Sequence, residues 1–331
     1  MLLAGDIGGT KTILALYSPE QGPRKPLVQK RFASQEYPSL ATVVQSFLQE
    51  YPHPIERACF GVAGPVIEGT AEITNLPWVI GVRNLQEILG IEEVFLLNDL
   101  EAVANAVPVL TTEDLYTLKE GVAVPGGAIA VIAPGTGLGE AYLTWDGRRY
   151  RAHASEGGHV DFAPRNAVEM ELLRYLLQRY DHVSYERVCS GKGIPNIYHY
   201  LKDSGYAGEP PWLAEALLAA DDPTPVIVAA ALGQQPHSEL CEATLEMFAS
   251  ILAAEAGNLA LKVLSTGGVY IGGGIPPRIL PVLDNQRFLQ SFLRKGRFTD
   301  FLIRMPLYVI VNEQAALIGA ARHGLVAWDG A

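Results

Sequence analysis

Residues 3–17 read Leu-Ala-Gly-Asp-Ile-Gly-Gly-Thr-Lys-Thr-Ile-Leu-Ala-Leu-Tyr, and this stretch predicts a strand, a tight glycine turn and a second strand. Gly8 and Gly9 lie between the two apolar runs and permit φ > 0. A turn with bare backbone N–H groups can wrap a phosphate, and a carboxylate beside a phosphate implies a bridging cation. The polar side chains that the turn offers are those of Asp6, Thr10, Lys11 and Thr12.

The same stretch is one residue short of a P-loop. Gly5-x4-Thr10-Lys11-Thr12 would match that motif if position 10 were glycine. A P-loop opens a helix, however, and the β-branched and aromatic run after Lys11 favours a strand. On this stretch alone, a phosphate-binding turn and an ordinary hairpin both stay open.

Length and composition predict a globular protein with two domains. The chain has 331 residues, 49% of them hydrophobic and 18% charged, which favours well-buried cores over disorder. A net charge of −11 argues against a nucleic-acid surface, although it leaves room for small anionic ligands held locally.

Three widely spaced cysteines form no C-x-x-C or Cys/His cluster, so we expect no zinc site and a reduced, cytoplasmic setting. Residues 1–17 lack the basic start and uninterrupted apolar run of an export signal. The longest apolar helix candidate, 239–264, contains Glu246, Glu255 and Lys262, so we expect no membrane span.

A second strand, glycine turn and strand follow about 128 residues after the first. The strand 127–133 leads into Pro-Gly-Thr-Gly-Leu-Gly-Glu (134–140), and 141–145 forms the returning strand. A lone glycine motif is weak evidence, but its repetition suggests two halves of related architecture with two phosphate-binding turns.

Polar residues also follow a predicted buried strand at 93–97, which ends at Asn98-Asp99 before a helix at 100–107. Open α/β sheets bind ligands at such strand ends, whereas the alternative for Asp99 is a helix N-cap. Asn75, in Thr-Asn-Leu-Pro-Trp, is either a turn former or a ligand contact.

Two later glycine runs are further candidates. Glu156-Gly-Gly-His159 could direct a carboxylate and an imidazole at one polar ligand, or form a solvated loop. Gly272–Gly274 follows a strand and could let the backbone approach a flat ligand, or form a flexible turn. The last helix is predicted over 312–323, capped by Asn312 and ended by Gly324.

Together these motifs resemble the bacterial glucokinases that lack a structural zinc, within the actin/hexokinase/Hsp70-like ATPase superfamily. The resemblance runs from residue 5 to about 322. No cysteine-rich zinc motif of the related kinase and repressor group is present, and no helix-turn-helix precedes the first strand. The motifs are Gly5–Thr10, Asn98-Asp99-x-Glu101-Ala102, Gly135–Gly139, Glu156–His159, Ser184–Val188 and Gly272–Ile275.

The resemblance implies an α/β fold with two ribonuclease-H-like domains and a cleft for ATP and sugar. The small domain would comprise 1–109 plus 312–331, and the large domain 110–311. Homodimers are usual in the family. The implied activity is ATP-dependent phosphorylation of glucose at the 6-hydroxyl. The alternatives are a kinase for mannose, fructose or an amino sugar, and a non-catalytic sugar sensor.

The resemblance also implies residue roles. Asp99 would be the general base, because a sugar hydroxyl must lose its proton during phosphoryl transfer. Asp6 would hold Mg²⁺ through water. Lys11 stands where many relatives have Asn, and it could touch a phosphate or face solvent. The other expected ATP contacts are Gly8, Gly9, Thr10, Gly135, Thr136, Gly137, Gly273 and Gly274. The expected sugar contacts are Asn75, Asn98, Asp99, Glu156, His159 and Glu186.

Overall fold

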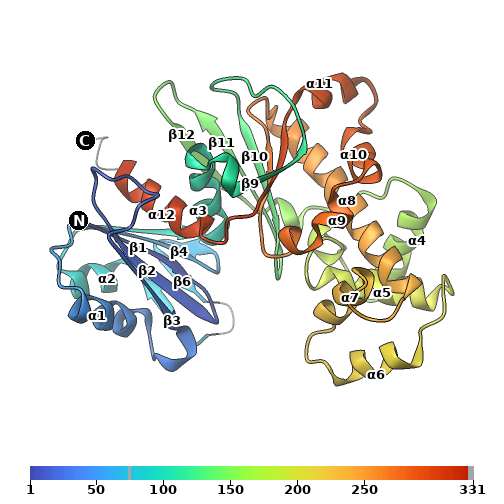
Figure 1. Cartoon of the computed structure of the whole chain (residues 1–331), viewed down its shortest axis with the longest axis horizontal. Helices are drawn as coiled ribbons and strands as arrows, with labels where there is room; N and C mark the ends of the chain where they lie inside the picture. The colour runs from blue at the N-terminus through green and yellow to red at the C-terminus, as the bar shows by residue number, and fades with distance from the viewer. Residues whose placement is uncertain (74–75, 327–331) are drawn as a thin grey trace. The chain divides into compact units, whose positions relative to one another are not determined.

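A computed structural model of the chain describes residues 1–73 and 76–326, which form two compact units (Figure 1). Unit 1 comprises Met1–Asp114, Asp146–Ala154 and the chain from Asn312 onward. Unit 2 comprises Leu115–Trp145 and Ser155–Val311. Each unit has its own β-sheet and hydrophobic core. The domain boundaries given by the family resemblance stay predictions.

The sheet of unit 1 has five strands in the order β3-β2-β1-β4-β8. β1 pairs antiparallel with β2 and parallel with β4, and β4 pairs parallel with β8. The strands are β1 (Leu2–Ile7), β2 (Lys11–Tyr17), β3 (Val28–Ala33), β4 (Arg57–Val62) and β8 (Glu93–Asn98). A small second sheet contains β5 (Val66–Ile67), β6 (Thr70–Glu72) and β7 (Val79–Gly81).

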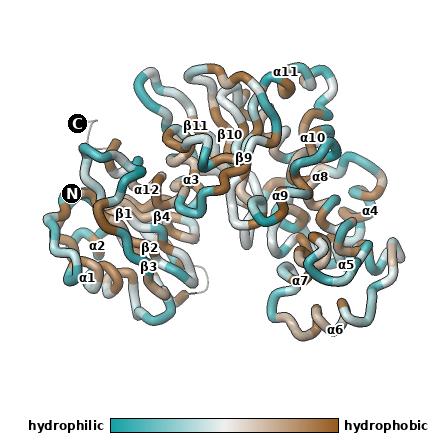
Figure 2. The backbone as a smooth tube through the Cα atoms, in the orientation of Figure 1, coloured by the Kyte–Doolittle hydropathy of each residue, from teal (hydrophilic) through white to brown (hydrophobic). Residues whose placement is uncertain are grey.

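Helices cover both faces of this sheet because its inner strands are apolar on both sides. Leu3 and Ile7 of β1 join one core cluster with α1, while Leu2 and Ala4 join a second with α3 and α12. Figure 2 shows the hydrophobic residues concentrated on such inner strands. The helices of unit 1 are α1 (Leu40–Glu50), α2 (Val82–Leu89), α3 (Asp99–Ala106) and α12 (Ala315–Val326).

Helix α12 differs from the prediction at both ends. It begins at Ala315, and Oδ1 of Asn312 accepts a hydrogen bond from the N–H of Gln314 in the preceding turn. It also continues through Gly324 to Val326, so the prediction that Gly324 ends the helix is wrong. A Cβ at Gly324 would lie 2.5 Å from Cδ1 of Leu2. This glycine therefore allows close packing of the helix on the sheet instead of terminating it.

Unit 2 repeats the strand pattern of unit 1. Its sheet contains β11-β10-β13-β14-β9 in that order, with β10 antiparallel to β11 and parallel to β13. β13 in turn pairs parallel with β14, as β4 does with β8. These strands are β9 (Leu115–Lys119), β10 (Ile129–Pro134), β11 (Leu138–Trp145), β13 (Val269–Ile271) and β14 (Leu307–Ile310). The predicted repetition of a hairpin at the head of each half is therefore present. β12 (Tyr150–Ser155) follows β11 in the chain.

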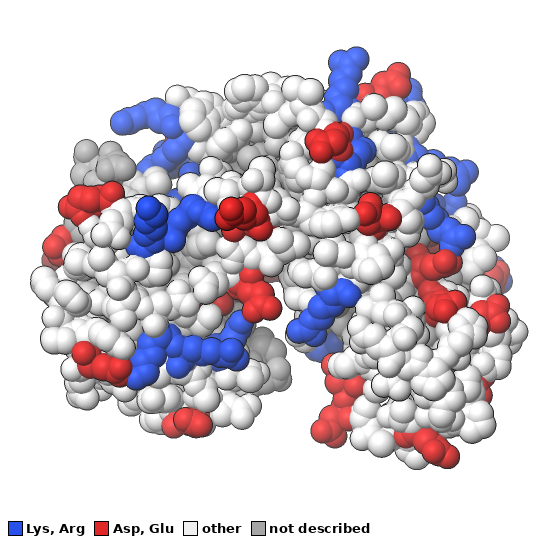
Figure 3. Space-filling model, viewed as in Figure 1, with Lys and Arg blue, Asp and Glu red and all other residues white. Residues whose placement is uncertain are grey.

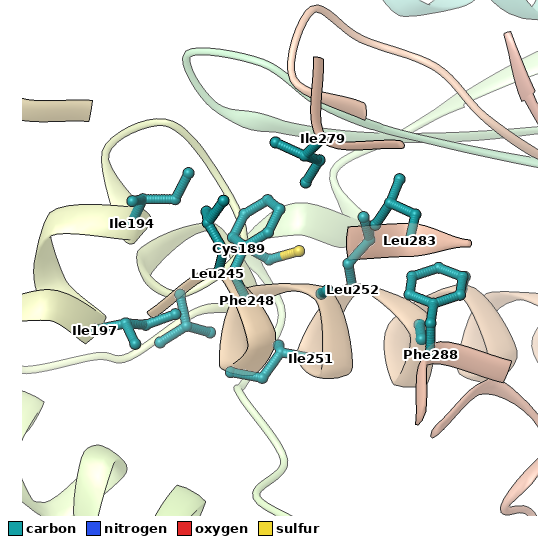
Figure 4. Close-up of a cluster of buried hydrophobic side chains, with 14 of the residues drawn as sticks. Cys189, Ile194, Ile197, Leu245, Phe248, Ile251, Leu252, Ile279, Leu283 and Phe288 are labelled. Carbon is teal, nitrogen blue, oxygen red and sulfur yellow. The ribbon is translucent and has the colours of Figure 1, made fainter. Parts of the chain in front are cut away.

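The core of unit 2 is built around the 25-residue helix α8 (Glu239–Val263). Figure 4 shows Leu245, Phe248 and Leu252 of this helix among buried side chains that include Cys189 and Ile194. The remaining helices of the unit are α4 (Ala167–Leu176), α5 (Gly193–Asp203), α6 (Pro211–Ala219), α7 (Pro223–Ala231), α9 (Leu280–Leu283), α10 (Gln286–Leu293) and α11 (Thr299–Arg304).

Within residues 1–73 and 76–326, no helix combines the length and hydrophobicity that crossing a bilayer requires. On the face shown in Figure 3, acidic and basic side chains are interspersed.

Candidate active site

The glycine turn of unit 1 is held by its own backbone and by one serine from outside the hairpin. Gly8 N–H donates to the carbonyl of Lys11 at 2.9 Å. The Ser34 hydroxyl donates to the Gly8 carbonyl at 2.8 Å, and its N–H donates to the Thr10 carbonyl at 3.1 Å. Thr12 is buried in β2, with its hydroxyl 3.0 Å from Ser34 Oγ. Thr12 therefore braces the turn.

The turn does not use the positive φ that Gly8 and Gly9 permit, because the positive φ angles within the described ranges lie at other residues. Thr10 at the tip is exposed, and the two glycines are partly buried. Small residues at the tip leave the backbone open to a ligand.

Asp6 and Asp99 influence each other across the carboxyl end of the unit 1 sheet. Asp6 is half-buried in β1, one strand residue before the turn. Burial raises the pKa of Asp6 to about 6, Lys11 opposes this rise, and the negative charge of Asp99 adds to it. Repulsion between two nearby carboxylates favours the protonated form of Asp6.

Asp99 is the first residue of α3, and Asn98 is the N-cap. Oδ1 of Asn98 accepts from the N–H of Leu100 at 2.9 Å and from that of Glu101 at 3.2 Å. The cap role that was one alternative for Asp99 thus belongs to Asn98, although Asp99 Oδ1 also accepts from Leu100 N–H at 2.8 Å. Asp99 itself is exposed. The protein atoms around the carboxyl group raise its pKa, and the hydrogen bonds from Leu100 and Asn98 oppose that rise.

The second glycine turn lies in unit 2 between β10 and β11. Gly135 N–H donates to the Gly137 carbonyl, and Gly191 N–H donates to the Gly135 carbonyl, both at 2.8 Å. Leu138 N–H donates to Oε2 of Glu186 at 3.0 Å. A Cβ at Gly137 would overlap that same oxygen. Glycine at this position leaves room for Glu186 against the backbone of the turn.

The predicted adenosine turn approaches the same hairpin. Gly272 N–H donates to the Ile132 carbonyl of β10 at 2.8 Å. Gly273 has φ of 87°, and a Cβ there would overlap the Pro134 carbonyl. A Cβ at Gly274 would meet open space, and Thr136 at the hairpin tip is exposed. Unit 2 therefore brings both of its predicted nucleotide-binding segments together.

The predicted sugar-binding residues of unit 2 also lie together. His159 and Glu186 line one cavity of about 380 Å³. Oε2 of Glu156 is 3.8 Å from Nε2 of His159, and both side chains are exposed. Ser184 and Arg187 of the motif Ser184–Val188 also line this cavity. Residues that the sequence motifs did not single out complete the lining: Arg179, Tyr180, Asp181 and His182.

One predicted site residue is not described by the structure, and two supporting residues were not predicted. Asn75 lies outside the described residues. Ser34 and Gly191 support the two turns, and neither belongs to the glycine motif that it contacts. In sequence, Ser34 is 26 positions from Gly8, so no local spacing indicated its role.

Comparison with known proteins shows the family of the chain. Residues 3–325 match the family model described as Glucokinase. The chain is 45% identical over 336 residues to a glucokinase of Nostoc punctiforme, covering 97% of this chain and 98% of the relative. A solved glucokinase from an Antarctic psychrotroph superposes with a TM-score of 0.82 at 31% identity, covering 98% of both chains.

A more distant structure extends the likeness of the fold. The ROK family glucokinase of Streptomyces griseus, solved in complex with glucose and AMPPNP, has a TM-score of 0.63 at 21% identity and covers 98% of both chains. These neighbours confirm the predicted α/β fold of the actin-like ATPase type. With a family model matching nearly its whole length and a relative at 45% identity, the chain belongs to the glucokinase family.

Proposed function

We propose that this protein transfers the γ-phosphoryl group of ATP to the 6-hydroxyl of glucose. The observation that carries the proposal is Asp99, an exposed carboxylate at the amino end of α3 and at the carboxyl end of the sheet. The motif around Asp99 matches that of the family, and the chain is 45% identical to a relative named glucokinase. Asp99 and Asp6 interact electrostatically within the same unit.

In the proposed reaction, Asp99 is the general base. The glucose O6 forms a bond to the γ-phosphorus while the bond to the bridging β–γ oxygen breaks. Asp99 accepts the proton that leaves O6. The helix dipole at the start of α3 favours the ionised carboxylate that a base requires, while the surrounding protein keeps its pKa above the ordinary value.

The remaining roles concern binding. The two glycine turns would hold the phosphates through backbone N–H groups, and Gly272–Gly274 would lie against adenosine. Mg²⁺, held at Asp6 through water, would neutralise phosphate charge. His159, Glu156 and Glu186 would hydrogen bond with sugar hydroxyls. The homodimer stays a prediction of the family resemblance, and the cytoplasmic location stays a prediction from the cysteine content and the N-terminal sequence.

A kinase for another hexose is the main alternative, because a polar cavity can accept several arrangements of hydroxyl groups. The test is ADP release from ATP across glucose, mannose, fructose and glucosamine, with ³¹P NMR to locate the new phosphate ester. We expect glucose to give the highest kcat/KM, with phosphate on the 6-oxygen. A higher kcat/KM for another hexose, or ADP release that is independent of sugar, would contradict the proposal.

A further inference from the structure

Unit 1 has a second cavity, of about 330 Å³, which the proposed reaction does not use. It lies among α3, the segment Asp146–Ala154 and α12. Its volume falls within the range of about 300–1,000 Å³ that is typical of ligand pockets. We name it the arginine pocket after the charged residues in its lining, which include Glu101, Arg149, Arg151, Arg322 and His323.

Arg322 is the most deeply buried charge of the arginine pocket, with 7% of its surface exposed. Its guanidinium group donates to the carbonyl and side-chain oxygens of Asn105 at 3.3 and 3.4 Å, and to the Tyr150 carbonyl at 3.4 Å. These are long hydrogen bonds to neutral acceptors. Within the described ranges, Arg322 has no carboxylate within ion-pair distance. A buried cation of this kind is costly unless an anion compensates it.

The neighbouring arginines increase the need for an anion beside Arg322. Arg149 donates to the Val326 carbonyl at 2.9 Å, and its charge adds to burial in lowering the pKa of Arg322. Arg151 pairs with Asp146 at 2.6 Å, whereas Arg149 Nε is 4.0 Å from the same oxygen. Among the residues that the structure describes, Asp146 therefore serves two arginines, and no carboxylate forms an ion pair with Arg322.

Among the described residues that line the pocket, Glu101 is the one carboxylate, against three arginines. Burial and the charges of Arg322 and Arg149 lower the pKa of His323 to about 4, so its imidazole is neutral at pH 7. Burial raises the pKa of Glu101, opposed by the N-terminal backbone of α3, without an arginine among the causes. The cavity is thus lined by guanidinium groups in excess of the carboxylates that face them.

We propose that the arginine pocket binds a small phosphorylated anion, either inorganic phosphate or a phosphate monoester, between Arg149, Arg151 and Arg322. The planar guanidinium fork matches two phosphate oxygens at once, and a dianion would compensate more than one of these cations. This site is additional to the proposed active site, since Asp6, Asp99 and the two glycine turns do not line it.

Isothermal titration calorimetry of the full chain tests the proposal. Inorganic phosphate and glucose 6-phosphate are titrated separately, with glucose and AMPPNP present at saturation to occupy the proposed active site. We expect one binding event in the parent protein. Arg149→Gln and Arg151→Gln should each raise its Kd about tenfold or more, since a charge-assisted hydrogen bond contributes about 1.5–3 kcal/mol.

Arg148→Gln is the matched control, because Arg148 is an exposed arginine of the same segment that does not line the pocket. It should leave Kd unchanged. Tighter binding of glucose 6-phosphate would support the monoester, and tighter binding of phosphate would support the inorganic ion. The absence of binding for both anions, or equal weakening in Arg148→Gln, would overturn the proposal. Arg149 and Arg151 are more exposed than Arg322, so their substitution should disturb folding less. The two variants therefore test the proposal even if a third variant, Arg322→Gln, does not fold.

Discussion

Oε2 of Glu186 accepts a hydrogen bond from the backbone N–H of Leu138 at 3.0 Å. This contact joins a predicted sugar-binding carboxylate to the end of a predicted phosphate-binding turn. A carboxylate has capacity for several hydrogen bonds, so Glu186 can still accept from a ligand hydroxyl in the cavity that it lines. Unit 2 therefore couples the positions of its two proposed substrate-binding elements through one side chain.

Gly137→Ala tests this coupling. The new methyl group would overlap Oε2 of Glu186, so the carboxylate must move away from Leu138. We expect the KM for glucose to rise about tenfold, equivalent to about 1.4 kcal/mol of lost binding, in steady-state assays. Gly208→Ala is the control, because a Cβ at Gly208 meets open space. An unchanged KM in Gly137→Ala would show that Glu186 does not bind sugar from this position.

Asn98 caps α3 and is also a predicted sugar contact, and substitutions can separate the two roles. Asn98→Ala removes the cap of α3 and should lower the free energy of unfolding by about 1 kcal/mol, measured by urea denaturation. Asn98→Ser retains a capping oxygen but loses the amide nitrogen, which donates to the Gly64 carbonyl at 3.4 Å and is the group that we expect to contact glucose. The serine variant should therefore keep most of its stability while the KM for glucose rises.

The control for the capping role is Asn285→Ala, which removes the equivalent hydrogen bond that Phe288 N–H donates to Asn285 Oδ1 at the start of α10. Asn285→Ala should lower the free energy of unfolding by a similar amount without changing the KM for glucose. If Asn98→Ser has the parent KM for glucose, then Asn98 is a cap only.

Glu140 introduces a pH dependence of stability in unit 2. It is 1% exposed, and burial together with the charge of Glu255 raises its pKa to about 8, while Lys262 opposes the rise. The folded protein binds the carboxyl proton of Glu140 more tightly than the unfolded chain does. The contribution of this proton to the free energy of unfolding is therefore complete below about pH 4.5 and decreases as pH rises toward 8.

Glu140→Gln keeps the shape of the side chain and removes the ionisation. We expect thermal unfolding to show a smaller loss of Tm between pH 5 and pH 8 in the variant than in the parent protein. The comparison between the two proteins cancels the contribution of Asp6, whose pKa is raised to about 6 in both. Parallel Tm curves over this range would mean that Glu140 does not stay protonated in the folded state.

The sequence was informative wherever structure depends on local pattern. The two hairpins, the buried strands and α8 follow from apolar runs and glycine turns, and these elements are present as predicted. The motif-bearing residues His159 and Glu186 line one cavity, although 27 sequence positions separate them. That juxtaposition came from the family resemblance, since no periodicity relates the two residues.

Tertiary packing accounts for what the sequence did not predict. Glycine is common at helix ends, but the glycine at position 324 is explained by the close contact between α12 and Leu2. In the sequence, Thr12 and Ser34 are ordinary strand and loop residues. The fold brings their hydroxyl oxygens to 3.0 Å from each other. The arginine pocket draws on three separate segments of unit 1, so its excess of positive charge is invisible in a chain whose net charge is −11.

The kcat of glucose-dependent ADP release in Asp99→Asn, beside that of the parent protein, tests the central proposal most directly. Glucose binding is measured separately by calorimetry, and Glu92→Gln, an exposed carboxylate before β8, is the control. We predict that kcat falls by about 10²-fold or more in Asp99→Asn while glucose still binds. A kcat in Asp99→Asn within a few-fold of the parent value would contradict the assignment of Asp99 as the base.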